Sequence, residues 1–150
     1  MVFREFDVMI ENIYHNEQLI SVIIRAQYQD DGINFFTPDS FSQQLAYMNR
    51  RKGYEIPPHV HNPVKREVSY TQEVLFIKSG CVRIDYYDND RNYLRSRILN
   101  QGDVVLLSDG GHGFFMCEDS EIIEVKQGPY AGDKDKTRFE PIEDERVRFD

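Results

Sequence analysis

Turn-forming residues recur along this chain at short intervals, and their spacing restricts the possible folds more than any other feature. Small groups of Gly, Pro, Asn, Asp and Ser separate short segments that are rich in Val, Ile, Leu, Tyr and Phe. Such segments are typical of the strands of a β-sandwich or β-barrel. The sequence therefore predicts an all-β fold built from antiparallel strands.

The turn residues also set the expected strand boundaries. Tight turns at 78–81 and 88–91 indicate hairpins. Near the N-terminus, Phe3, Phe6, Met9 and Ile10 lie close to helical spacing, so a short helix over the first dozen residues is the alternative there. Strands are expected over residues 19–27, 44–51, 73–78, 82–87, 93–99, 104–107, 113–117 and 121–126.

A length of 150 residues suits a single domain. Its barrel core is expected over about residues 19–128, after an extra N-terminal segment. Residues 129–150 are polar and charged, which predicts either a solvated tail or an arm that reaches across a partner subunit. A homodimer is expected, because the open edges of a small antiparallel sheet have to be covered.

Charge and hydropathy exclude several classes of partner. The chain has 18 Lys and Arg against 26 Asp and Glu, a net charge of −8, which disfavours binding to nucleic acid or to an anionic membrane. Its apolar runs are far shorter than a membrane span. The N-terminus does not resemble a secretory signal, so we expect a cytoplasmic protein in which Cys81 and Cys117 stay reduced and form no disulfide.

Two closely spaced histidines, His59 and His61, are the first candidates for chemistry. Residues i and i+2 of an extended strand point to the same face, with their Cα atoms roughly 6–7 Å apart. Both imidazoles can then bind one metal ion. The preceding Pro57 and Pro58 restrict the backbone and lower the entropic cost of holding the pair.

Glu73 and His112 could complete a ligand set. Glu73 begins a strongly apolar predicted strand, on which Leu75 and Ile77 share its face. His112 follows the glycine-rich turn 109–111 and shares its predicted face with Phe114 and Met116. A site of three imidazoles and one carboxylate leaves positions open for water or substrate, as catalytic metal sites require.

The simpler interpretation of each residue is structural. An isolated H-x-H pair often consists of two surface histidines, and a single carboxylate at a strand start is often only solvated. His15 has no partner at a useful spacing and is interpreted as a surface residue. A metal-free dimerising barrel, in which the histidines pair with neighbours, is thus a third hypothesis beside an enzyme and a binding module.

Two motifs of the chain resemble those of the cupin superfamily. The first holds the H-x-H pair and Glu73 between two glycines, and the second ends at His112. The residues are Gly53, His59, His61, Glu73 and Gly80 in the first motif and Gly102 and His112 in the second. The resemblance covers residues 44–128 and implies a jelly-roll β-barrel in which His59, His61, Glu73 and His112 bind one divalent metal ion.

The chain departs from the family pattern in both motifs. Residues 62–72 separate the H-x-H pair from Glu73, where the family usually has three or four residues. Glu67 within this insert is the competing carboxylate, although it lacks the six-residue spacing to Gly80 that Glu73 has. In the second motif Ser108 replaces the usual proline, and one residue is missing before His112.

The resemblance implies a metal-dependent cupin that acts on a small molecule, as a sugar or sugar-nucleotide isomerase or epimerase or as an oxygenase. The alternative is a barrel that binds a metal or small ligand without turnover. Nitrogen and oxygen ligands serve Fe, Mn, Ni, Zn and Cu alike, so the metal is not identified. Tyr47, Glu55 and Tyr70 are candidates for acid–base assistance, but nothing in the sequence shows which way they face.

Overall fold

The structure, a computed structural model, describes residues 8–150, which form two compact units. The first unit contains residues 8–28 and 71–150, and the second contains residues 29–70. Every strand pairing in the described residues is antiparallel, and the helical elements there are two short 3-10 turns. The prediction of an all-β antiparallel fold is confirmed.

The first unit holds most of the strands, and the second holds one hairpin. In the first unit the elements are β1 (Ile10–His15), β2 (Gln18–Ile24), β5 (Glu73–Ser79), β6 (Cys81–Tyr87), β7 (Tyr93–Asn100), β8 (Val104–Leu107), β9 (Gly111–Met116), β10 (Glu121–Lys126), η1 (Gly132–Lys134) and η2 (Asp144–Arg146). In the second unit they are β3 (Gly32–Phe35) and β4 (Ala46–Asn49).

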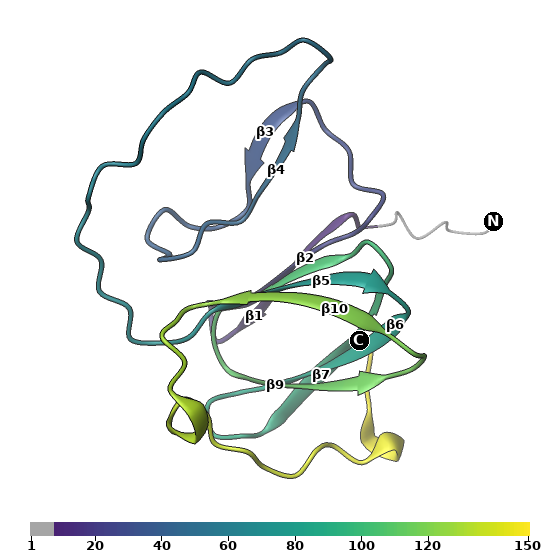
Figure 1. The fold of residues 1–150 in the computed structure, drawn as a ribbon. Coiled ribbons are helices and arrows are strands. Elements are labelled where there is room, and N and C mark those ends of the chain that lie inside the picture. Colours follow the sequence, from purple (N-terminus) through teal and green to yellow (C-terminus); the bar gives the residue numbers. More distant parts are fainter. Residues whose placement is uncertain (1–7) are drawn as a thin grey trace, which may run out of the picture. The chain divides into compact units, whose positions relative to one another are not determined.

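Two sheets face each other in the first unit (Figure 1). One has the order β1-β2-β8-β5-β10, and the other has the order β7-β6-β9. Alternate residues of both sheets point into one shared core. The buried cluster takes Ile13, Ile20, Ile23, Leu75, Ile77, Val105 and Leu107 from the larger sheet and Val82, Ile84, Tyr86 and Leu99 from the smaller one.

The predicted hairpin at residues 78–81 is wrong, whereas the one at 88–91 is confirmed. β6 pairs with β7 across the second turn, but β5 and β6 belong to different sheets. Gly80 therefore carries the chain from one sheet to the other. It has φ +86°, and a Cβ atom there would lie 2.3 Å from the backbone oxygen of Asp119. Only glycine fits this crossing without strain.

Several predicted strand boundaries were also wrong. β2 ends at Ile24 instead of residue 27, and β4 covers four residues of the predicted 44–51. β1 and β3 were not predicted, because polar residues interrupt their apolar pattern. The alternative of an N-terminal helix falls partly on residues outside the described range; within that range, the chain enters β1 at Ile10.

The C-terminal residues 139–150 form an arm that packs on the first unit's own three-stranded sheet. The Phe139 ring lies 5.0 Å from the Tyr87 ring, and the Ile142 N–H donates to the Tyr87 hydroxyl at 2.9 Å. At the sheet edge, the Ser96 N–H donates to the Arg148 carbonyl at 2.7 Å. Through these contacts residues 139–150 follow the sheet of their own chain, although most of them are exposed to solvent.

Within residues 8–150, the structure contains no helix with the length and hydropathy needed to traverse a lipid bilayer.

Candidate functional site

Glu73 is the first residue of β5 and points to the inner face of its sheet. It shares that face with Leu75 and Ile77, both of which are buried in the core, as predicted. Its carboxylate side chain is 12% exposed. The sequence thus places a charged group at the first position of an apolar strand, at the boundary between the buried core and solvent.

His112 reaches the same place from the opposite sheet. It lies on β9 across from Tyr86 of β6, whose ring is buried in the core, so the imidazole also points inward. Its Nε2 atom is 3.1 Å from Oε2 of Glu73, and its side chain is 27% exposed. The two predicted ligands of the first unit are therefore in direct contact and partly accessible to solvent.

The surroundings of the pair favour the ionised form of Glu73. The hydrogen bond from His112 lowers the pKa of Glu73 below its ordinary value of 4.5, while burial of the carboxyl group acts in the opposite direction. The positive charges of His112, Lys126 and Lys136 lower this pKa further. A carboxylate that stays ionised is ready to bind a cation at neutral pH.

Two neighbours complete the environment of the pair. The Phe114 ring centroid lies 5.5 Å from that of His112, which confirms that both residues share the inner face of β9. Lys126 of β10 is the cross-strand partner of Glu73. Sequence reasoning missed Lys126, because only the register between β10 and β5 brings it beside the carboxylate.

His59 and His61 belong to the second unit, on an exposed segment that is not part of a strand. None of the expected strands covers this segment, and Pro57, Pro58 and Pro63 have no N–H group to contribute to a ladder. The predicted proximity of the two imidazoles is confirmed, with ring centroids 5.3 Å apart. Pro57 contributes its carbonyl to a 3.0 Å hydrogen bond with Nδ1 of His59.

The remaining predicted residues take no part in the Glu73–His112 pair. Nε2 of His15, the last residue of β1, lies 3.9 Å from the carboxylate of Asp88. Cys81 and Cys117 are free thiols. Glu67, Tyr47, Glu55 and Tyr70 all belong to the second unit. In the described part of the chain, no three His, Cys, Asp or Glu side chains gather closely enough to hold a metal ion.

Two hollows of the first unit lie away from this pair. One, of about 840 Å³, separates the β6–β7 hairpin from the C-terminal arm. The other, of about 850 Å³, lies beside Arg25, whose guanidinium is paired with Asp103 at 2.9 Å and with Glu11 at 3.5 Å. Both are open and lined by groups that already bind each other. Neither hollow has Glu73 or His112 in its lining.

No family model, curated protein or solved structure matches this chain. The resemblance of its two motifs to the cupins consequently stays a prediction from the sequence.

Proposed function

We propose that this chain is a metal-dependent jelly-roll protein that acts on a small molecule. Glu73 and His112 of the first unit would be ligands for a divalent metal ion, and the H-x-H motif makes His59 and His61 the further candidates. The observation that carries the proposal is the contact between Glu73 and His112. Two residues that were selected as ligands from separate sequence motifs meet at 3.1 Å, from two different sheets.

The order of the strands supports the jelly-roll part of the proposal. The chain crosses between the two sheets from β5 to β6, from β7 to β8, from β8 to β9 and from β9 to β10, and it stays within one sheet from β1 to β2 and from β6 to β7. Repeated crossings of this kind are a feature of double-sheet jelly rolls. A simple meander would instead pair each strand with the next.

The chemistry of the donors fits a divalent transition metal. Imidazole nitrogens together with one carboxylate suit Fe, Mn, Ni, Zn and Cu. Such an ion supplies Lewis acidity for the isomerisation or epimerisation of a sugar or sugar nucleotide, or an oxygen-binding centre if it is redox-active. In the protein itself, the contact with His112 orients the Glu73 carboxylate, and Lys126 across the strand pair helps to keep it ionised.

Metal occupancy of purified variants tests the proposal. We expect Glu73→Gln, His112→Ala and His61→Ala each to weaken binding of Mn²⁺, Ni²⁺ or Zn²⁺ by at least about tenfold, since even the loss of a group supporting a ligand costs about 10–100-fold. His15→Ala is the matched control, because it removes an imidazole from β1, which β2 and β8 separate from β5. Unchanged occupancy in the first three variants, or an equal loss in the control, would contradict the proposal.

Turnover is measured separately from binding. Oxygen uptake and sugar-nucleotide isomerisation are assayed with the metal-loaded wild type and with His61→Ala. We expect activity in the wild type that the variant lacks. If the wild type and the variant differ in metal content but give equal rates of oxygen uptake and of isomerisation, the protein binds metal without turnover.

A further inference from the structure

The strand β10 forms one edge of the five-stranded sheet. It is the last strand in the order β1-β2-β8-β5-β10 and pairs with β5 on one side. Among residues 8–150, no strand pairs with its other side. Proteins normally cover, shorten or charge such an edge, because its free backbone groups can pair with another chain. β10 has six residues and no proline, and its pairing with β5 is in regular register from Ile122 to Lys126, after a register shift at Glu121.

The outer face of this edge exposes apolar side chains. Ile123 and Val125 are 52% and 57% exposed, and Phe76, the cross-strand neighbour of Ile123 on β5, is 38% exposed. They point away from the core, since Leu75 between Phe76 and Val74 is the residue that faces inward. Glu124 and Lys126 occupy the opposite, inner face of β10. The edge therefore has an apolar face and a face with one charge of each sign.

A second copy of the chain can pair with this edge through a two-fold axis. In an antiparallel pair the residues that lie opposite each other point to the same face. The two-fold axis therefore has to lie midway between one residue of β10 and the same residue of the second copy. An axis at Glu124 would place two carboxylates directly opposite each other. An axis at Val125 instead places Glu124 of each copy opposite Lys126 of the other, and Val125 opposite itself.

We propose that the chain forms a homodimer through antiparallel pairing of β10 with β10 of a second copy, centred on Val125. The charges decide this register, because opposite charges across a strand pair are stabilising and like charges are destabilising. Two Glu124–Lys126 pairs then flank the axis on the inner face. On the outer face, Phe76, Ile123 and Val125 of one copy and the same residues of the other form one continuous apolar patch across the axis.

The other free edge near the candidate site is less suited to such pairing. β9 contains Gly111 and Gly113, and glycines weaken a strand because they lack side chains to pack. Its outward-facing Phe115 ring is already covered by the Arg83 guanidinium at 4.8 Å. β10 has no glycine, and its outer face is exposed, so it is the better suited of these two edges.

The dimer has a consequence for the candidate site but does not depend on the proposed function. Lys126 is the cross-strand partner of Glu73 within one copy. In the dimer, Glu124 of the second copy would lie opposite Lys126. Each copy would thus contribute a carboxylate close to the other's Glu73–His112 pair.

A charge swap tests both the dimer and its register. We expect the wild type to sediment at twice 17.7 kDa. Glu124→Lys and Lys126→Glu should each raise the dimer dissociation constant about tenfold, because two symmetric attractions become repulsions. The double variant restores opposite charges and should return to within about threefold of the wild type. A wild-type monomer at high concentration, or a double variant no better than the single ones, would overturn the proposal.

Disulfide cross-linking locates the axis independently of charge. In a Cys81→Ser, Cys117→Ser background, Val125→Cys should cross-link the two copies on mild oxidation, since the axis places this residue opposite itself. Ile123→Cys is the matched control and should cross-link poorly, because it would face Gln127. Efficient cross-linking through position 123 and none through 125 would overturn this register.

Discussion

Tyr86 shows how one polar group joins the two sheets of the first unit. Its ring is buried in the core, and its hydroxyl lies 2.9 Å from Oγ of Ser21 on β2. Ser21 donates its own hydrogen to the Leu106 carbonyl at 2.8 Å, so the Tyr86 hydroxyl is the donor to Ser21. The hydrogen bond satisfies both buried hydroxyls, which would otherwise destabilise the core.

Burial of this hydroxyl makes the stability of the protein depend on pH in alkaline solution. Removal from water raises the pKa of Tyr86 above its ordinary value of 10.0. Above about pH 10 the unfolded chain loses this proton and the folded chain retains it. The free energy of unfolding therefore falls as the pH rises, by at most about 1.4 kcal/mol per pH unit.

Tyr86→Phe should flatten this alkaline decline. At pH 7.5 the variant should lose about 1 kcal/mol, the usual value of one hydrogen bond, because Ser21 keeps its bond to Leu106. Urea unfolding at pH 7.5 and near pH 11 measures both effects. Tyr130→Phe, at an exposed position, is the control and should behave like the wild type. The same decline in Tyr86→Phe and the wild type would refute this account.

Individual residues of the candidate site could be predicted only where a motif gave their spacing. Glu73 and His112 were selected from their spacing to glycines and from the resemblance, and the structure brings them into contact. Lys126 could not be selected, because its place beside Glu73 depends on the strand register. No local pattern in residues 121–126 encodes that register.

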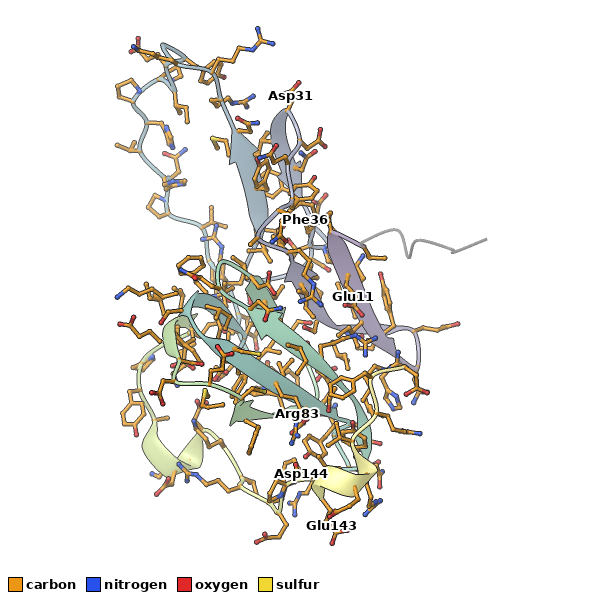
Figure 2. The ribbon with its side chains drawn as sticks, turned by 90° about the vertical axis from the view of Figure 1, so that its right-hand side faces the viewer. Glu11, Asp31, Phe36, Arg83, Glu143 and Asp144 are labelled. Carbon is orange, nitrogen blue, oxygen red and sulfur yellow. The ribbon has the colours of Figure 1, made fainter. Side chains whose placement is uncertain are left out.

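At the scale of elements, the C-terminal arm is the clearest case of a segment whose role depends on packing. Asp85 and Tyr87 point to the outer face of β6 and are nevertheless buried. In Figure 2, Arg83 on the same strand face points toward Asp144 of the arm, and their side chains are 3.0 Å apart. The arm therefore shields the outer face of the three-stranded sheet from solvent.

Deletion of residues 139–150 should consequently lower the stability of the first unit by about 3 kcal/mol or more. The deletion exposes the Tyr87 ring and leaves the Ser96 N–H without its partner, and both losses are unfavourable. Asp144→Ala is the control. It removes one ion pair whose carboxylate is 72% exposed, while Arg83 keeps its pair with Asp85, so it should cost less than about 1 kcal/mol. Equal denaturation midpoints for the deletion and the full chain would contradict a structural role for the arm.

The strands themselves were predictable to different degrees. Those with continuous apolar runs, such as β8 and β5, were predicted almost to the residue, because both periodicity and composition favour strands there. Their pairing was less predictable. A glycine turn such as Gly80 serves a hairpin and a crossing between sheets equally well, so the sequence around it does not determine which strand pairs with which.

At the scale of the whole molecule, two features of the structure could not be predicted from local patterns in the sequence. Residues 29–70 form a compact unit of their own, although no change in composition marks its limits. The C-terminal segment resembled a solvated tail or an arm, because most of its residues are polar or charged. Both outcomes depend on contacts between distant parts of the chain, which turn signals and periodicity do not report.

The central claim is that Glu73 and His112 bind a metal ion, and anomalous diffraction from crystals grown with Mn²⁺ or Zn²⁺ tests it most directly. We expect an anomalous peak at a bonding distance of about 2.0–2.2 Å from Nε2 of His112 and from a carboxylate oxygen of Glu73. The bond that now joins these two side chains should then be replaced by bonds to the ion. A structure in which they still bind each other, with no anomalous peak beside them, would contradict the claim.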